Sequence, residues 1–412
     1  MRASEPRPAV TRRDFLKYTS AGTALLGASP FLARGQASAN ERIGIGLIGV
    51  GGRGSALMGE IVALAKKHNV QITAVCDVWR KNLSAAVARV KAKLGEEPRQ
   101  FTRFADLLAL KDVDAVTIAT PDFSHGPILT AALKAGKDVY VEKPMAIDLA
   151  LANEALDLAR ANNRVVQAGT QRRSEGRYIA AANLVGTGIL GQINRISVAM
   201  NFNEPRWARN SDDCKAEDVD WDAFLLHLPK RPFDARLLRQ WQLYRDFTNG
   251  LSGLWMTHYA DAVHMLTGAK YPASAVALGG IYAWKDGREH TDTFHALLDY
   301  PEGFLFSWGM GLGNSAGTHF SVHGTKGTLD LEKCTLSADG GRDSAVETRQ
   351  VTAEKGPSHM DNWLACLRSR QRPNADIQFG HQHVVATVMA ATALETGRRQ
   401  KYDPAKRAIA AG

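Results

Sequence analysis

The sequence of 412 residues has few cysteines and no long apolar run. Its four cysteines form no CxxC pair and have no Cys/His partner at zinc spacing, which argues against a disulfide scaffold and against a zinc module. No window holds the roughly 18 consecutive apolar residues of a membrane-spanning helix. With 45% hydrophobic and 23% charged residues, the composition is that of a soluble globular chain too long for one average domain.

The net charge of +9 does not by itself indicate a nucleic-acid-binding protein. Residues 1–39 carry six basic and two acidic side chains, a net of +4, which leaves about +5 for the other residues. Those residues contain no basic run and no alternation of basic and aromatic side chains. We therefore expect no nucleic-acid partner.

The first 39 residues have the order of a secretory leader. Thr11–Lys17 reads TRRDFLK, residues 18–33 are mildly apolar and small, and Ala37-Ser38-Ala39 is a small-x-small cleavage site. The paired arginines make the segment resemble a twin-arginine (Tat) leader. We predict a Tat signal peptide over 1–39, recognition by the Tat machinery, and a periplasmic or otherwise exported mature protein.

A glycine-rich loop follows the first apolar segment of the predicted mature chain. Residues 42–48 predict a buried strand, 55–67 a helix, and 71–76 a second strand that ends at Asp77. Between the first strand and the helix stands Gly49-Val50-Gly51-Gly52-Arg53-Gly54. Strand, glycine loop and helix, with an acid after the next strand, are the context of a dinucleotide-binding fingerprint.

Each glycine has a part in that prediction. Gly49 permits the tight turn, Gly51 lets backbone amides approach a diphosphate, and Gly54 lets the helix pack on the strand. A carboxylate at Asp77 accepts the ribose hydroxyls and repels a 2′-phosphate, which favours NAD over NADP. Arg80 and Lys81 lie close enough in sequence to weaken that preference.

Strands and helices go on alternating to residue 168, with a strand at 138–141 and a helix at 149–161, which predicts a parallel sheet with right-handed crossovers. Polar residues follow two of the expected strands: Thr120-Pro121 and Glu142-Lys143-Pro144. Ligands bind such sheets at the carboxyl ends of the strands, so both groups are expected in the crevice of the glycine loop. A lysine beside a nicotinamide can exchange a proton with a hydroxyl whose carbon gives up hydride, which makes Lys143 the candidate catalytic residue.

The chain resembles the Gfo/Idh/MocA oxidoreductases. The matching motifs are Gly49–Gly54, Ala119-Thr120-Pro121-x-x-x-His125, Ala135-Gly136-Lys137-x-Val139-x-x-Glu142-Lys143-Pro144, Gly169-Thr170-Gln171-Arg172-Arg173, His258-Tyr259-Ala260-Asp261 and Val322–Gly327. The resemblance implies a Rossmann domain followed by an α/β domain with a large, mostly antiparallel open sheet. It also implies that Lys143 is the catalytic lysine, that Gly52, Arg53, His125, Glu142 and Gln171 join the cofactor contacts, and that Arg172 contacts the substrate.

The second half has its own pattern. Strands such as 193–203, 293–300 and 304–311, with turns such as Pro301-Glu302-Gly303 between them, predict antiparallel pairing. The expected organisation is a leader at 1–39, a Rossmann domain at 40–170, a substrate and oligomerisation domain at 171–380, and a C-terminal helix and tail at 381–412. Open sheets of this family mediate dimers and tetramers, so the resemblance implies a homo-oligomer.

A helical segment near residue 258 departs from the family. The family carries a D-x-x-x-H-x-x-D-like pattern whose histidine contacts the substrate hydroxyl, and here His258 and Asp261 match while Leu254 replaces the first aspartate. We predict a catalytic role for His258 and a substrate contact for Asp261. Just upstream, Trp241, Tyr244 and Asp246 combine aromatic faces with a carboxylate, which suits a sugar ring. No further ligand accompanies His381-x-His383, so no metal is expected.

An export leader on a dinucleotide-binding chain restricts the reaction. The periplasm holds little free NAD, so the enzyme is expected to retain its cofactor and return it to the starting redox state in each cycle. One solution is oxidoreduction of a CH–OH group in a sugar or glycoside. A second is glycoside hydrolysis through transient oxidation at C3 and elimination. A third alternative, a sugar-binding protein that keeps NAD without catalysis, is suggested by Leu254.

Overall fold

The structure is a computed structural model, and it describes residues 42–338 and 346–412. The predicted leader at 1–39 lies outside the described residues. Among those residues, no helix combines the length and the apolar character needed to cross a membrane.

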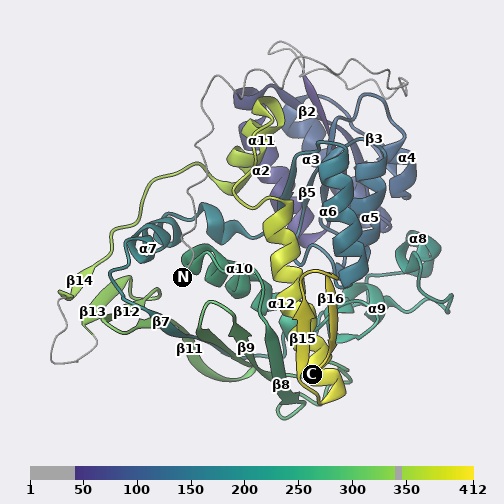
Figure 1. Ribbon diagram of the computed structural model, residues 1–412. Helices are drawn as coiled ribbons and strands as arrows, with labels where there is room; N and C mark the ends of the chain where they lie inside the picture. Colours follow the sequence, from purple (N-terminus) through teal and green to yellow (C-terminus); the bar gives the residue numbers. More distant parts are fainter. Residues whose placement is uncertain (1–41, 339–345) are drawn as a thin grey trace, which may run out of the picture. The chain divides into compact units, whose positions relative to one another are not determined.

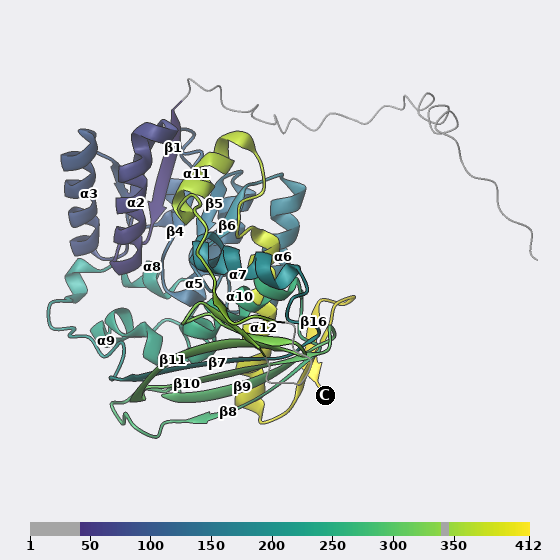
Figure 2. The same cartoon turned by 90° about the vertical axis from the view of Figure 1, so that its left-hand side faces the viewer.

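The first half is a six-stranded parallel sheet in the order β3-β2-β1-β4-β5-β6. Its strands lie in the upper part of Figure 2, with helices on both faces. They are β1 (Ile43–Ile48), β2 (Val70–Cys76), β3 (Arg99–Phe101), β4 (Ala115–Ile118), β5 (Asp138–Val141) and β6 (Val166–Ala168). The helices are α2 (Gly52–His68), α3 (Arg80–Leu94), α4 (Phe104–Leu108), α5 (Asp122–Lys134) and α6 (Leu149–Ala161). This doubly wound arrangement confirms the predicted Rossmann fold.

The second half is a ten-stranded sheet in the order β14-β13-β12-β11-β7-β10-β9-β8-β15-β16. All its pairs are antiparallel except β7 with β10, which confirms the predicted mostly antiparallel sheet. The strands are β7 (Ile193–Asn203), β8 (Ser274–Gly280), β9 (Thr293–Tyr300), β10 (Phe304–Gly311), β11 (Gly313–Gly324), β12 (Gly327–Asp330), β13 (Thr335–Ala338), β14 (Arg349–Gln350), β15 (Gln400–Asp403) and β16 (Ala408–Ala411).

One face of this sheet is covered by three helices: α7 (Gly176–Gly186), α10 (Thr257–Thr267) and α12 (Ile377–Thr396). Figure 2 shows them between the large sheet and the nucleotide half. Side chains alternate strictly along β9, where Phe294, Ala296, Leu298 and Tyr300 are buried against the helices. The core of this half therefore lies between the sheet and its helical layer.

The last two helices complete the nucleotide half. Residues of α11 (His359–Ser369), among them Trp363 and Leu364, belong to the apolar core between α2 and the parallel sheet. Ile377 and Val384 of α12 pack with residues of α6 in the core on the other face of that sheet, and α12 lies alongside α6 in Figure 1. Segments far apart in sequence thus support the strands that carry the glycine loop.

A long connection between β7 and α10, residues 204–251, forms short helices over the nucleotide half. It contains η2 (Ala216–Asp218), α8 (Trp221–Leu225), α9 (Ala235–Arg239) and η3 (Trp241–Leu243). Phe224 and Phe247 of this connection pack their rings against Phe123 at the start of α5. We call residues 204–251 the covering segment.

Candidate active site

The glycine loop joins β1 to α2 at the edge of a cavity of about 1020 Å³. Gly49 has a φ of +79°, and a Cβ on Gly54 would stand 1.9 Å from the Gly49 carbonyl oxygen. These two positions therefore require glycine for the turn itself. A Cβ on Gly52 would meet no atom within 4 Å, although Gly52 lines the cavity. The space that a side chain at position 52 would occupy is therefore open to a ligand and is not filled by protein atoms.

The N-terminus of α2 suits an anionic group. Its N-cap residue, Gly51, offers no side-chain cap, and the first turn holds no acidic residue. The first backbone N–H groups of a helix have no partner within the helix, and the helix dipole adds partial positive charge there. A diphosphate fits such a cradle, as it does in other dinucleotide-binding folds. Gly49, Gly51, Gly52 and Arg53 would hold it when the dinucleotide is bound.

Asp77 stands at the end of β2 beside this loop and is 8% exposed. Its Oδ2 accepts from Val50 N at 2.9 Å, and its Oδ1 accepts from Trp79 N at 2.9 Å. Burial raises the pKa of Asp77, while these backbone donors oppose the shift. Asn82 Nδ2 also donates to both oxygens, at 3.4 Å each. The acid therefore fixes the loop, and a nucleoside hydroxyl would compete only with the long contacts from Asn82.

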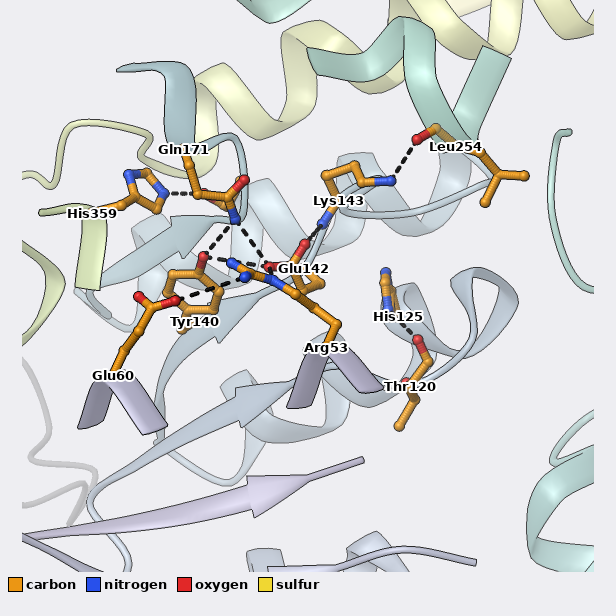
Figure 3. A network of polar contacts seen from close by, with 11 residues as sticks. Arg53, Glu60, Thr120, His125, Tyr140, Glu142, Lys143, Gln171, Leu254 and His359 are labelled. Atoms are coloured by element: carbon orange, nitrogen blue, oxygen red, sulfur yellow. Dashed lines mark hydrogen bonds and ion pairs between the residues drawn. The ribbon is translucent and has the colours of Figure 1, made fainter. Parts of the chain in front are cut away.

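Glu142 connects the two nucleotide motifs of the sequence. Arg53 Nε of the glycine loop donates to Glu142 Oε1 at 2.6 Å, and Gln171 Nε2 donates to the same oxygen at 3.1 Å (Figure 3). Gln171 also donates to the phenol oxygen of Tyr140 at 3.0 Å, and burial raises the pKa of Tyr140 so that the phenol stays neutral. A Cβ on Gly169 would lie 2.6 Å from Glu142 Oε2. Glu142 is thus a buried carboxylate that positions the start of the Lys143 loop.

Thr120 and Pro121 follow the end of β4, and His125 lies in the first turn of α5, which begins directly after them. The ring of His125 spans two loops, with Nε2 at 2.7 Å from Thr120 O and Nδ1 at 2.8 Å from Pro144 O. His125 is 1% exposed. Figure 3 shows His125 beside Thr120, which it contacts. His125 therefore fixes the crevice wall, and all three residues line the cavity.

Lys143 lies partly buried in the same cavity, together with His258. Its Nζ donates to the backbone carbonyl of Leu254 at 2.6 Å (Figure 3). Burial lowers the pKa of Lys143, and the charges of Asp122 and Glu142 partly oppose that shift. A lysine with a lowered pKa has a larger neutral fraction near pH 7 and can accept a proton there.

The chain around Leu254 has the wider turn of a π-helix. It runs over η4 (Ser252–Met256), and Thr257 N donates to Ser252 O, five residues back. Such turns occur as short insertions next to α-helices, frequently at functional sites. Here α10 follows at once. Leu254, which replaces the family aspartate, therefore accepts the hydrogen bond of Lys143 Nζ with its backbone carbonyl oxygen.

His258 occupies the second position of α10. Its Nδ1 is buried and has no hydrogen-bond partner among the described residues. Burial lowers the pKa of His258 well below its usual range, and the positive charges of Lys143 and Arg172 act in the same direction. A neutral imidazole with a buried unpaired nitrogen is unusual without a ligand. His258 therefore lines the cavity as a neutral side chain whose Nδ1 is unpartnered among the described residues, as are Nδ1 of His264 and His383.

The predicted substrate residues do not all reach the cavity. Trp241 lines it. Tyr244 packs in the aromatic core of the covering segment, and Asp246 is an exposed partner of Arg231 at 2.6 Å. Asp261 is fully buried and accepts from Arg173 Nε at 2.8 and 2.9 Å, a contact that fixes α10 against η1 (Gln171–Ser174). Arg172 donates to Tyr178 Oη at 2.8 Å and lies over the ring of Tyr259.

Some cavity residues were not predicted from the sequence. Asp122 and Asn82 line the cavity, and so does a group from the covering segment that includes Trp207, Arg209 and Arg239. The Thr120-Pro121 motif gave a signal for Asp122, which follows it directly. Trp207, Arg209 and Arg239 gave none, because their placement depends on the tertiary contacts of the covering segment with Phe123, Val78 and Trp79. Among the described residues, no group of three His, Cys, Asp or Glu side chains is placed to hold a metal.

Fold and cavity define an NAD-binding oxidoreductase. The chain belongs to the Gfo/Idh/MocA family: the description "Oxidoreductase family, NAD-binding Rossmann fold" matches residues 43–170, and "Oxidoreductase family, C-terminal alpha/beta domain" matches residues 182–402. Both halves of the described chain are thus accounted for by one family, and the resemblance seen in the sequence is confirmed.

The individual relatives match only part of this chain or have low sequence identity to it. Inositol 2-dehydrogenase of Salmonella typhimurium is 30% identical over 148 residues, 36% of this chain and 42% of that protein. A glycosyl hydrolase family 109 protein of Shewanella sp. is 31% identical over 182 residues, 42% of this chain and 38% of that protein. The chain thus spans less than half the length of these two relatives. Among solved structures, the WlbA dehydrogenase of Bordetella pertussis, in complex with NADH and UDP-GlcNAcA, has a TM-score of 0.67 and 20% identity, covering 88% of this chain and 99% of that one.

Proposed function

We propose that this chain is an exported oxidoreductase that acts on a CH–OH group of a sugar or glycoside and keeps and recycles its own NAD. The observation that carries the proposal is the placement of Lys143 and His258 in the cavity that the glycine loop lines. The WlbA structure and inositol 2-dehydrogenase support a polyhydroxylated substrate by analogy with their own ligands and names.

The residues divide the chemistry between them. A dinucleotide held by the glycine loop and Asp77 would supply the acceptor for the hydride of the carbon that carries the hydroxyl. Neutral Lys143 Nζ takes the hydroxyl proton in the same step, which leaves a carbonyl on the substrate and an ammonium on the protein. His258 hydrogen-bonds the reacting oxygen, and Glu142 and Leu254 hold the lysine loop and the lysine nitrogen. The reverse transfer to a second acceptor returns both proton and hydride.

The preference for NAD over NADP belongs to this proposal. Asp77 supports it, since its buried carboxylate would face a 2′-phosphate. Arg80 Nη1 lies 3.5 Å from Asp218 and Lys81 Nζ lies 2.5 Å from Asp213. Both cations are therefore paired with acids of the covering segment, which reduces their attraction for a further phosphate.

Retention of the cofactor is supported by the covering segment. Asp220 N donates to Val78 O at 2.8 Å, and Trp79 pairs with Val219 across an isolated β-bridge. Asp220 Oδ2 also accepts from Thr102 Oγ1 at 3.1 Å and lies 3.5 Å from Arg103 Nε. These contacts join the covering segment to the loops after β2 and β3, where the adenosine half of a dinucleotide binds in a Rossmann fold. Release of the cofactor would then require this segment to move.

This predicts faster cofactor release from Asp220→Ala. The variant loses the contacts to Thr102 and Arg103 and the N-cap of α8, where Asp220 Oδ1 accepts from Ala223 N at 3.0 Å. Asp234→Ala is a matched control, because Asp234 caps α9 in the same segment through Arg236 N and its side chain makes no contact with the nucleotide half. The lost contacts to Thr102 and Arg103, worth about 1 kcal/mol together, correspond to roughly fivefold faster dissociation in Asp220→Ala, whereas Asp234→Ala loses only a helix cap and should release the cofactor at the wild-type rate. Exchange against labelled NAD measures it, and equal rates in the two variants would contradict the proposed retention.

Export and oligomerisation are further parts of the proposal. The twin-arginine pattern at 1–39 supports recognition by the Tat machinery and a periplasmic location. The outer face of the large sheet carries exposed apolar side chains: Leu278 of β8 is 79% exposed, Leu297 of β9 42% and Leu305 of β10 37%. An exposed apolar sheet face supports a homo-oligomer, dimer or tetramer, formed through that face.

The function is tested on the purified protein without added cofactor. Incubation with candidate sugars is expected to produce reduced nicotinamide absorbance from bound cofactor, and a second sugar or its oxidised form is expected to discharge it. Release of free sugar from an aryl glycoside, with the absorbance returning to its start, would favour the hydrolase alternative that the Shewanella relative suggests. Absence of any hydride signal and of any product would favour the non-catalytic sugar-binding alternative.

A further inference from the structure

Lys143 is held by a backbone oxygen at the position where this chain departs from the family motif. The motif has an aspartate at position 254, and here the Leu254 carbonyl accepts from Lys143 Nζ at 2.6 Å. A carbonyl orients an ammonium but carries no net charge. When Lys143 accepts a proton, the new positive charge therefore needs a carboxylate from elsewhere in the cavity.

Asp122 lies where such a carboxylate would act. It is the first residue of α5, is 2% exposed and lines the same cavity as Lys143. A Cβ on Gly253, the neighbour of Leu254, would lie 3.7 Å from Asp122 Oδ2 and 3.5 Å from Pro144 Cγ, the neighbour of Lys143. Asp122 thus stands beside both chain segments that meet at the lysine nitrogen.

The orientation of Asp122 is set from the covering segment. Thr248 Oγ1 donates to Asp122 Oδ2 at 2.8 Å, and both side chains are buried. No hydrogen-bonded cation accompanies Asp122 among the described residues. Glu142, the other carboxylate near Lys143, already accepts from Arg53. Of the two acids, Asp122 has its charge available for the lysine.

The groups around Lys143 come from several elements. Asp122 and Glu142 raise its pKa, whereas burial, Arg53 and Arg172 lower it. Burial raises the pKa of Asp122, and the charge of Lys143, with a smaller contribution from His125, opposes that rise. His258 and His383 both have pKa values well below the usual range because of burial, so they are neutral near pH 7. The acids are therefore the groups that stabilise a charged Lys143.

We propose that Asp122 is the counter-charge of Lys143 in this chain, which has no carboxylate at position 254. This inference rests on the proposed function, in which the substrate hydroxyl loses its proton to Lys143 Nζ as the same carbon loses hydride. The ammonium then forms beside an ionised carboxylate, so the lysine and the acid together end the step without net charge. Asp122 is a positioning residue, since it acts on the reaction through Lys143.

The test measures the titration of Lys143 in the protein with its cofactor bound. Reductive ¹³C-methylation gives each lysine an NMR signal, and the signal lost in Lys143→Arg identifies Lys143. In Asp122→Asn the pKa of Lys143 is expected to fall by about one unit or more, because an opposite charge nearby shifts a pKa by that amount. Asp157→Asn, which removes an exposed partner of Arg407, is expected to leave the titration unchanged.

Two further variants keep the proposal falsifiable. Asp122→Ser keeps a hydrogen-bonding side chain at the start of α5 and is expected to give the same fall. Leu254→Asp combined with Asp122→Asn returns a carboxylate to the family position and is expected to restore the pKa. An unchanged Lys143 titration in Asp122→Asn and Asp122→Ser would overturn the proposal.

Activity gives a second readout that separates this inference from the proposed function. Where a sugar is oxidised, the acid limb of the kcat/KM profile is expected to move to lower pH in Asp122→Asn, since the neutral lysine persists to lower pH. If the wild-type protein oxidises no sugar, the proposed function fails, while the NMR titration still decides whether Asp122 holds the charge of Lys143.

Discussion

Lys143→Ala is expected to retain bound dinucleotide and to lose turnover by about 10²–10⁴-fold, the range that general acid–base groups contribute. The cofactor should stay because the glycine loop, Asp77 and Glu142 do not depend on the lysine nitrogen, which donates to Leu254. Single-turnover reduction of the bound cofactor by a sugar measures the loss, and absorbance of the denatured protein measures cofactor content.

Two companion variants separate charge from proton transfer in this experiment. Lys143→Arg keeps a positive charge but cannot give up a proton near pH 7, so it should be about as slow as Lys143→Ala. Lys134→Ala removes an exposed lysine paired with Glu154 and should behave as wild type. Turnover of Lys143→Ala close to the wild-type value would remove the catalytic assignment.

Gly54→Ala and Gly52→Ala are expected to fail in different ways. A Cβ at position 54 would stand 1.9 Å from the Gly49 carbonyl oxygen, so the loop must shift, at a loss of about 2–3 kcal/mol in the free energy of unfolding. A Cβ at position 52 would meet no protein atom within 4 Å, and alanine favours the helix that begins there. Gly52→Ala should therefore fold normally and bind dinucleotide about ten- to a hundredfold more weakly.

Urea unfolding of the cofactor-free protein and calorimetric titration with NAD measure these two effects separately. The two variants are expected to differ because Gly52 faces the ligand cavity, whereas Gly54 packs against the backbone of the loop itself. Unaltered NAD affinity in Gly52→Ala would contradict the assignment of the cavity to a dinucleotide.

Local sequence patterns predicted the fold well where one segment determines its own structure. The expected bounds match those of the strands β5, β7, β9 and β10 and of the helix α6. A short apolar run between turn signals allows few other positions for the ends of a strand or helix. The glycine loop was predictable for the same reason. Strand ends of a parallel sheet also converge by topology alone, so the order of the elements was enough to predict that Thr120 and Lys143 share one crevice.

The rest of the site depends on contacts that cross the chain. Arg53 and Glu142 are 89 residues apart in sequence and belong to two separate motifs, and their hydrogen bond is visible only in the fold. Asp261 was predicted to contact substrate from the family motif that it shares with His258, but a motif cannot show that Arg173 donates to its carboxylate. The role of Leu254 was equally hidden, because its backbone carbonyl rather than its side chain meets Lys143.

The late helices α11 and α12 bear on how the protein is made. Trp363, Leu364, Ile377 and Val384 fill cores around a sheet whose last strand ends at Ala168. A ribosome therefore releases nearly the whole polypeptide before the nucleotide half can close its interior. Cofactor loading is therefore expected late in synthesis, since the sheet that carries the glycine loop lacks part of its core until α11 and α12 have been made.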